Sequence, residues 1–450
     1  MARTPHRTPR DVLRGVNSES RRSSRALKAS EPKSFAPSSR RLVAAGLVGN
    51  VLEWYDFSIY GYFAAMVGET FFPSHNPTTS LIAAFGVFSA GFITRPLGAL
   101  LFGYIGDRHS RERSLTLSIV AMAIPTCVTG LLPGYATIGL AAPVIMVALR
   151  LIQGLSAGGE YTTSIVFLIE RSGQARRGFM GSFGLFGSIA GGMLGSALGA
   201  ALTFVMPQEQ IYAWGWRLPF IFGLAPAFVG VMIRRELAQL ADYEPPSRTP
   251  IGRVLVNHWR AIIKVFGFEI LEGVGFYTTF IYLTTYFTRV AQVPQRNALT
   301  VNTLCMGLVL LIIPASGALS DRIGRKPLLL AAAAAMALFA WPLFRLMHRA
   351  SFGAVLAAEL SLALIIGLYE GTAPATAAEA FPMGIRATGV AVAFNSCMTL
   401  FGGTTPMAAT YLIALTGSSM APAGYLIVAA VIAAGFVLSL GETGKAPLAS

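Results

Sequence analysis

Two short stretches of the chain repeat one pattern: GYIGDRHSRER at residues 103–113 and GALSDRIGRKP at residues 317–327. Each follows an apolar segment, and aligning their aspartates also aligns a glycine and two arginines. A second pair, ERSGQARRG at 170–178 and EAFPMGIRATG at 379–389, recurs at nearly the same offset. A repeat of this length indicates that the chain consists of two homologous halves.

The composition indicates that both halves lie in a membrane. Hydrophobic residues make up 54% of the chain and charged residues 12%, against about 25% charged in soluble proteins. The mean hydropathy is +0.59. The net charge of +14 lies mostly in the first 41 residues and in short loops, where membrane orientation accounts for it, so we do not expect nucleic-acid binding.

Twelve apolar segments are long enough to cross a bilayer, which takes about 20 residues. We therefore predict an all-α polytopic membrane protein with twelve transmembrane helices in two six-helix halves, acting as a monomer in the lipid bilayer. The segments are 42–66, 81–105, 115–133, 140–165, 179–205, 217–234, 260–287, 299–319, 328–346, 354–375, 389–415 and 421–441.

The predicted domains follow from these segments. The halves are 42–234 and 260–441, joined by a cytoplasmic loop at 235–259, with a short tail at 442–450. With the N-terminus inside, the outer loops contain only Arg289, Arg296, Arg345 and Arg349, so the positive-inside rule places both termini in the cytoplasm.

The tail at 1–41 is rich in arginine, serine and proline and has no apolar core like that of a secretory signal. We expect a disordered basic arm at the cytoplasmic surface, with a transit peptide as the alternative. The three cysteines are far apart in apolar segments, which predicts neither disulfides nor a metal site.

The repeated loop, together with RLIQGLSAGGEY at 150–161, resembles the major facilitator superfamily. GNVLEWYDFSIYGYF at 49–63, GFITRPLGALLFGYIGDR at 91–108 and WGWRLPFIFG at 214–223 resemble its metabolite:proton symporter branch, which carries citrate, 2-oxoglutarate, shikimate and proline or betaine. The resemblance implies a transporter in the bacterial inner membrane. It uses the proton gradient and has no cofactor.

Ionisable groups at bilayer depth are functional candidates by default. Glu53 and Asp56 lie on the order of 20 Å from the inner face of a core of roughly 30 Å. Gly49, Glu53, Asp56 and Tyr60 share one helix face, which must look into the bundle. We favour proton coupling for the carboxylate pair; the alternative is a helix-packing role. Glu269 and Glu272 recur at the same spacing in the second half.

Two arginines accompany these carboxylates. Arg150 shares a stripe with Gln153 and Glu160, and it resembles the superfamily's fourth-helix arginine linked to proton transfer. A permanent salt bridge to a carboxylate of the first span is the alternative, and Glu160 suits a gate as well as a ligand. Arg95 precedes Pro96 and suits a forked grip on a substrate carboxylate, or else a pair with Asp56 or Glu53.

Other residues complete the candidate sites. Tyr277, Glu370 and Asn395 could line a cavity and, with Tyr60, Gln153 and Glu160, are candidate substrate ligands. Tyrosine attracts quaternary ammonium, although most membrane aromatics only pack. The cytoplasmic loops offer gating latches, with Glu170 expected to pair with Arg176 or Arg177, and Glu379 with Arg386. The remaining gating residues are Asp107, Arg108, Arg111, Asp321, Arg322 and Arg325.

These features predict a proton-coupled symporter for a small carboxylate-bearing solute, which works by alternating access. A zwitterion such as proline or betaine would use both the arginine and the acidic, aromatic lining, whereas a di- or tricarboxylate would need more cationic groups. Export by proton antiport and a transporter-like solute sensor are the alternatives. We do not expect an enzyme, because no metal cluster, nucleophile–base set or phosphate loop is evident in the sequence.

Overall fold

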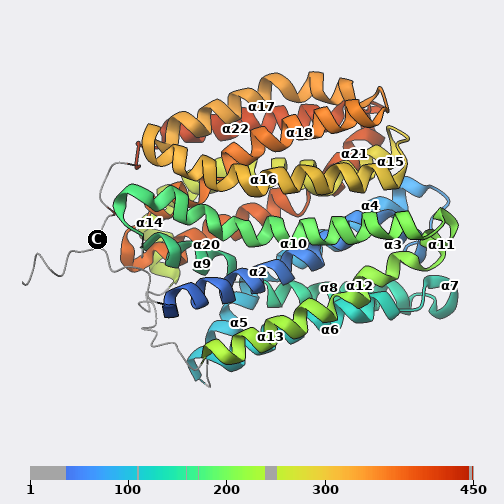
Figure 1. The fold of residues 1–450 in the computed structure, drawn as a ribbon, viewed down its shortest axis with the longest axis horizontal. Coiled ribbons are helices and arrows are strands. Elements are labelled where there is room, and N and C mark those ends of the chain that lie inside the picture. Colours follow the sequence, from blue (N-terminus) through green and yellow to red (C-terminus); the bar gives the residue numbers. More distant parts are fainter. Residues whose placement is uncertain are drawn as a thin grey trace, which may run out of the picture. The chain divides into compact units, whose positions relative to one another are not determined.

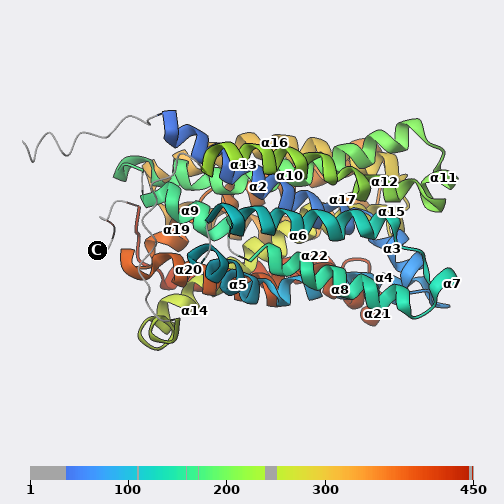
Figure 2. The same ribbon diagram turned by 90° about the horizontal axis from the view of Figure 1, so that it is seen from below.

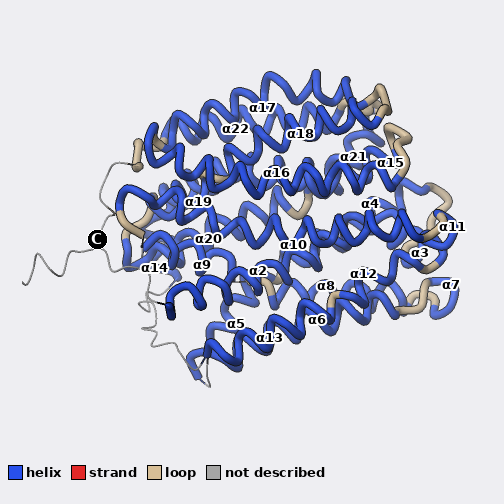
Figure 3. The backbone as a smooth tube through the Cα atoms, in the orientation of Figure 1, coloured by secondary structure: helices blue, strands red, loops and turns tan. Residues whose placement is uncertain are grey.

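A computed structural model describes residues 37–108, 111–158, 160–170, 172–238, 251–444 and 448. Most of the predicted basic tail (1–36) and much of the central loop (239–250) lie outside these residues. The chain divides into a short unit, Met1–Arg41, and one compact unit, Leu42–Ser450. Helices account for nearly all of the described part, and no strand occurs in it (Figure 3).

The helices before the central loop occupy the first six predicted segments, several of them as two pieces (Figure 1). Buried backbone groups in a bilayer need internal hydrogen bonds, which a helix supplies within one segment. The longer helices are α2 (Pro37–Tyr62), α3 (Ala64–Phe71), α4 (Pro77–Ile93), α5 (Arg95–Arg108), α6 (Arg111–Leu131), α8 (Ala141–Ser156), α9 (Glu160–Glu170), α10 (Arg177–Val205) and α13 (Leu224–Ala238), with short α7 (Tyr135–Ile138), η1 (Gln174–Arg176), α11 (Gln208–Ala213), η2 (Gly215–Arg217) and α12 (Leu218–Phe222) between them.

The helices after the loop occupy the other six predicted segments in the same way. They are α14 (Ile251–Phe276), η3 (Tyr277–Tyr282), α15 (Leu283–Arg289), α16 (Gln295–Ile323), α17 (Arg325–Met347), α18 (Phe352–Glu370), α19 (Ala373–Glu379), η4 (Met383–Ile385), α20 (Arg386–Cys397), η5 (Met398–Gly402), α21 (Thr405–Thr416) and α22 (Ala421–Ser439).

Seven continuous helical stretches in the described part are long and apolar enough to cross a membrane. In Figure 1, α10 and α16 run side by side through the middle of the bundle and pack closely, although one precedes and the other follows the central loop. Seen from below in Figure 2, α6 lies beside α8, and α7 and α11 lie at the end opposite the start of α14. We call that end the far end, and the opposite end, where α10 and α17 begin, the basic end.

Several helices break near mid-membrane. Pro96 has no N–H to donate to the carbonyl of Phe92, and the helix is interrupted at Thr94 between α4 and α5. The Thr399 hydroxyl, from η5, donates to that carbonyl at 3.0 Å. η3 and η5 are π-helical turns, a geometry frequent at functional sites. The breaks place backbone and side chains of both halves around a common centre.

Candidate functional site

The α2 carboxylates are held by two different arginines. Glu53 and Asp56 are each 2% exposed. Arg95 Nη2 lies 3.3 Å from Glu53 Oε1, and Arg150 Nη1 lies 3.4 Å from Asp56 Oδ2. Residues three apart on a helix diverge enough in direction for one to face α5 and the other α8. The sequence left open whether these arginines pair with carboxylates, and the structure pairs both.

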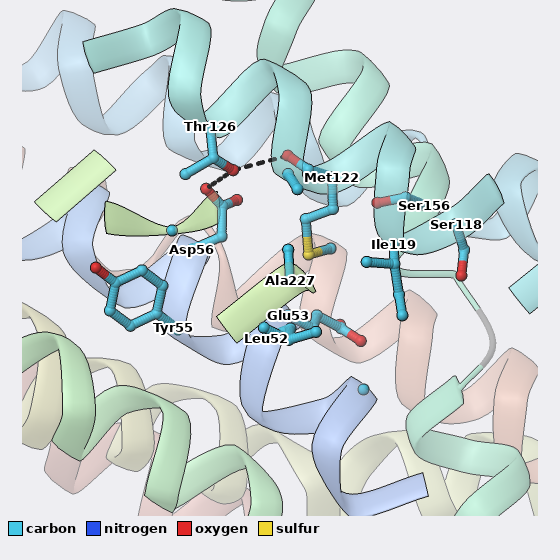
Figure 4. A pocket seen from close by; sticks show the side chains of 13 residues that line it. Leu52, Glu53, Tyr55, Asp56, Ser118, Ile119, Met122, Thr126, Ser156 and Ala227 are labelled. Carbon is cyan, nitrogen blue, oxygen red and sulfur yellow. Dashed lines mark hydrogen bonds between the residues drawn. The ribbon is translucent and has the colours of Figure 1, made fainter. Parts of the chain in front are cut away.

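Asp56 has hydrogen-bond partners besides Arg150. The Thr126 hydroxyl donates to Oδ1 at 2.6 Å, a contact drawn in Figure 4, and Gln153 Nε2 donates to the same oxygen at 2.8 Å. We call Asp56, Arg150, Gln153 and Thr126 the aspartate cluster. Its single negative charge is matched by a single positive charge, so the cluster is neutral without any ligand.

Aromatic rings cover both guanidinium groups. Arg150 Cζ lies 3.8 Å from the Tyr60 ring centroid, and Arg95 Cζ lies 4.5 and 4.3 Å from the rings of Phe57 and Phe92. The Tyr60 hydroxyl donates to a backbone carbonyl at 3.0 Å. Tyr60 and Gln153 were predicted as substrate ligands, but the structure places them against Arg150 and Asp56.

Two glycines let α8 approach the broken helix. A Cβ on Gly154 would overlap the carbonyl of Gly91 and the Thr94 hydroxyl, and a Cβ on Gly158 would overlap the carbonyl of Arg95. The Thr94 hydroxyl donates to the Leu151 carbonyl at 2.9 Å. This close packing brings Arg150 within reach of α2.

A pocket opens beside α2, within the helices that precede the central loop. Besides Glu53 and Asp56 its lining includes Thr126, and Figure 4 shows Asp56 and Thr126, two members of the aspartate cluster, beside each other. The remaining lining residues are Gly49, Leu52, Tyr55, Ser118, Ile119, Met122, Ala123, Ser156, Gly223 and Ala227. Both carboxylates of α2 therefore line the same pocket.

The carboxylates of the second half form a cluster of a different kind. Glu269 and Glu272 on α14 lie against each other, and Glu370 on α18 adds its charge. All three are buried, and the Tyr161 hydroxyl donates to Glu272 Oε1 at 3.4 Å. We call Glu269, Glu272 and Glu370 the acidic cluster. Within the described residues no lysine or arginine pairs with it, and both oxygens of Glu370 lack a hydrogen-bond partner.

Tyr277, in the π-helical turn η3, lies between the two groups of charges. It is 1% exposed, and its ring is 6.0 Å from that of Trp54 and 5.5 Å from that of Phe92. Its hydroxyl lies within electrostatic range of both Arg95 and Glu370. Its hydroxyl has no hydrogen-bond partner among the described residues. Tyr277 therefore lies between the arginine-paired carboxylate of α2 and the acidic cluster.

The other predicted ligands stand elsewhere. Asn395 donates to the Ala391 carbonyl of its own helix at 2.9 Å, so its amide is engaged away from the acidic cluster. The side chain of Glu160 is outside the described part of the chain, as are those of Asp107, Arg108 and Arg111.

At the basic end, buried ion pairs link the two halves. Glu379 Oε1 lies 3.1 Å from both Arg177 and Arg325, and Arg325 lies 2.8 Å from Asp321. Asp321 also accepts from the backbone N–H of Gly178 at 2.8 Å. Gly324, which precedes Arg325, has a φ of +105°, a conformation that favours glycine. The repeated loop thus supplies the groups that hold this end together.

The predicted pairing at the basic end is wrong. Arg386 Nη1 lies 2.8 Å from Glu170 Oε1, and Glu379 binds Arg177 and Arg325. Each glutamate therefore pairs across the halves, because α9 and α10 face α19 and α20 in the folded chain. Arg322 is exposed, with no ion pair in the described part.

Sequence reasoning missed Glu359, a carboxylate on α18 with 0% exposure. The signal was present, since Glu359 lies in the apolar run AVLAAELSLALII (354–366) and meets the same criterion as the other intramembrane carboxylates. Thr126 and Tyr161 were missed for a different reason, because hydroxyl residues are common in membrane helices and carry no charge to single them out.

The geometry can be compared with known proteins. The sequence pattern that defines the Major Facilitator Superfamily matches residues 46–406. The chain is 34% identical over 424 residues to a proline/betaine transporter of Salmonella typhimurium, covering 91% of this chain and 85% of that one. It is also 34% identical to a glycine betaine/proline/ectoine/pipecolic acid transporter of Dickeya dadantii, over 91% and 84%.

Solved structures share the fold at lower identity. A xylose transporter of Escherichia coli in a partially occluded inward-open conformation matches with a TM-score of 0.71 and 18% identity, covering 91% of this chain and 99% of that one. The proton:xylose symporter bound to a glucose analogue gives a TM-score of 0.70 and 19% identity, over 91% and 97%. These matches confirm the predicted all-helical polytopic fold.

Proposed function

Since the chain belongs to the major facilitator superfamily, and is a membrane transporter rather than an enzyme, we propose that it imports a zwitterion such as proline or betaine together with protons. The substrate class is supported by the two bacterial relatives, whose names specify proline and betaine.

The observation that carries the substrate proposal is the placement of opposite charges on either side of Tyr277. Arg95, with its guanidinium between aromatic rings, can bind a carboxylate, and the acidic cluster can bind an ammonium group. Trp54 and Tyr277 offer ring faces for the methyl groups of a quaternary ammonium. A dicarboxylate would meet three carboxylates with no cation to offset them.

Proton coupling is assigned to the aspartate cluster. Asp56 can exchange its partner Arg150 for a proton, and the pocket beside it gives a path for that proton. Glu53 is tied to Arg95, so a substrate carboxylate that binds Arg95 competes with Glu53 for the guanidinium. Glu269 and Glu272 can hold a shared proton until the substrate cation replaces it.

The two halves, 42–234 and 260–441, would rock about the centre in a bacterial inner membrane, with the basic end and both termini in the cytoplasm. The ion pair of Glu379 with Arg177 and the hydrogen bond from the Gly178 N–H to Asp321 would then break as the cytoplasmic side opens. We propose that a single chain performs the cycle.

The experiment is uptake of labelled glycine betaine by bacteria that lack their own betaine carriers and express this chain. The competitors distinguish the carboxylate site at Arg95 from the cation site at the acidic cluster. Proline carries both charges, choline carries only the cation, and 2-oxoglutarate carries two carboxylates. We expect proline to compete and the other two to have little effect. Competition by 2-oxoglutarate stronger than that by proline would contradict the proposal, and saturable binding without accumulation would favour a sensor.

A further inference from the structure

Glu359 lies in a part of the molecule that the proposed cycle does not use. It is seven residues from the start of α18 at the far end, a depth of about 10 Å. Its side chain is 0% exposed. Glu370 on the same helix is eleven residues further along, roughly 16 Å away, so Glu359 does not belong to the acidic cluster.

Glu359 takes part in a hydrogen-bonded network that joins the two halves. In one orientation of the Asn302 amide both of its polar atoms have partners, and its nitrogen donates to Glu359 Oε1 at 3.0 Å and to the Phe280 carbonyl at 3.3 Å. Its oxygen then accepts from Ser196 Oγ at 3.1 Å and from the Tyr62 hydroxyl at 3.2 Å. Tyr62 and Ser196 belong to α2 and α10, whereas the others follow the central loop.

The network lacks a positive charge. No ion pair to Glu359 occurs within the described residues, and Glu359 Oε2 has no hydrogen-bond partner there. The titratable groups that feel its charge are the phenol of Tyr62 and the thiol of Cys305, which are both uncharged near neutral pH.

The other elements packed against α18 bring no countercharge to Glu359. On α17, Arg345 is exposed and Arg325 is at the basic end. Glu269 and Glu272 of α14 are in the acidic cluster, and Glu379 of α19 binds Arg177. The titratable side chains of η3 are the phenols of Tyr277 and Tyr282. On α16, Arg296 is exposed and lies over the Phe204 ring, and Asp321 and Arg322 are at the basic end.

The free-energy cost of burying a carboxylate in this position depends strongly on whether it is ionised or protonated. An ionised carboxylate buried without a cation costs several kcal/mol, whereas a protonated one that accepts a hydrogen bond costs far less. Opening the far end would separate Tyr62 and Ser196 from Asn302 and admit water, which removes the cost of ionisation. Closing that end with Glu359 charged is therefore unfavourable.

We propose that Glu359 is a proton-binding site that must be occupied before the far end of the transporter can close. The carboxylate takes one proton from water on the far side as the Tyr62, Ser196 and Asn302 contacts form. It returns the proton to the same side when they break. This proton is not delivered across the membrane and is distinct from the one assigned to Asp56. This inference rests on the proposed alternating-access cycle, but it does not depend on which solute is transported.

The test measures far-end opening without solute. Spin labels are attached to cysteines introduced at Ser74 and Arg349, exposed loop positions of the two halves, after Cys127, Cys305 and Cys397 are replaced by alanine. Electron–electron distances in liposomes are then recorded across a series of pH values. One linked proton makes the closed-to-open ratio rise by up to about tenfold per unit of acidification.

For Glu359→Gln, which resembles the protonated acid in shape and polarity, we expect the closed form to predominate with less than about a twofold change per pH unit. Glu69→Gln is the matched control: it removes an exposed far-end carboxylate that pairs with Arg289 and should keep the full response. Asn302→Ala removes the donor to Glu359, so the carboxylate should bind its proton more tightly and the response should move to less acidic pH.

A full pH response in Glu359→Gln, or none in the parent protein, would overturn the proposal. The proposed function fails separately, since a chain that transports no zwitterion can still close in response to protons, and a betaine carrier can lack that response. Unfolding midpoints of all variants show whether a lost response reflects misfolding.

Discussion

The aspartate cluster and the acidic cluster both bury carboxylates near mid-membrane, but only in the aspartate cluster is the negative charge paired with a positive one. Asp56 has an arginine, an amide and a hydroxyl as partners. In the acidic cluster the Tyr161 hydroxyl donates to Glu272, both oxygens of Glu370 lack a partner, and no cation pairs with any of the three in the described part of the chain. The comparison indicates that the first site is built to be stable when empty, and that the second needs protons or a bound cation.

The largest expected effect comes from breaking the complete site. Arg150→Leu leaves Asp56 buried without its countercharge, which we expect to lower the free energy of unfolding by about 3–5 kcal/mol. Thermal unfolding in detergent measures the loss. The double variant Asp56→Asn/Arg150→Leu removes both charges and should recover most of the stability. If the double variant is as unstable as the single one, the ion pair is not what the cluster depends on.

The acidic cluster should respond in the opposite direction. Glu370→Gln removes one of three like charges, so we expect the solute-free protein to gain roughly 1 kcal/mol of stability. Its affinity for glycine betaine should fall about tenfold, because a charged hydrogen-bonding partner of the ammonium is lost. Calorimetric binding and thermal unfolding give the two values.

Asn395→Ala is the control for the acidic cluster. Its amide is occupied within its own helix, so betaine affinity should change by less than about twofold. A Glu370→Gln variant that loses stability and binds betaine normally would remove the cluster from the cation site and leave it a packing role.

The smallest effect concerns a carboxylate in water at the basic end. Partial burial alone raises the pKa of Glu442, but the backbone N–H groups of Arg325, Gly444 and Lys326 outweigh it and hold the pKa below its usual value. Since the folded pKa is the lower one, the contribution to stability is present above the ordinary glutamate range and is lost as the pH falls through the folded pKa.

As the pH falls, the parent protein should lose a small amount of stability through Glu442, on the order of 0.5 kcal/mol because solvent screens the charges. Glu442→Gln should not show this loss. Unfolding midpoints measured over a series of acidic pH values give the difference. Thr443→Val removes a neighbouring hydrogen bond to Glu379 without removing a titrating group, so it should leave the pH dependence unchanged. An unchanged profile in Glu442→Gln would show that these backbone contacts contribute nothing.

The sequence was sufficient for the helical segments and for the carboxylates on α2, because bilayer length and helical period leave few alternatives. It could not assign partners. Glu53 and Asp56 face one cavity by pattern, but which arginine each meets depends on how closely α8 approaches at Gly154 and Gly158. A one-dimensional pattern contains no such distance.

The same limit explains the errors at the basic end. Glu170 and Arg177 are close in sequence and suggest a local pair, but the fold places Glu170 beside Arg386 and Arg177 beside Glu379. The π-helical turn at Tyr277 was also invisible, since no residue type marks such a turn reliably. At the basic end, the partners of Glu170 and Arg177 come from the other half of the chain.

The central claim, that protons and a zwitterion cross together, is tested most directly in liposomes containing the purified protein and a trapped pH indicator. An inward gradient of glycine betaine is imposed with no initial pH difference. We predict that the interior acidifies as betaine enters, and that Asp56→Asn exchanges labelled betaine without any change in internal pH. Betaine entry by the parent protein with a constant or rising internal pH would contradict the claim.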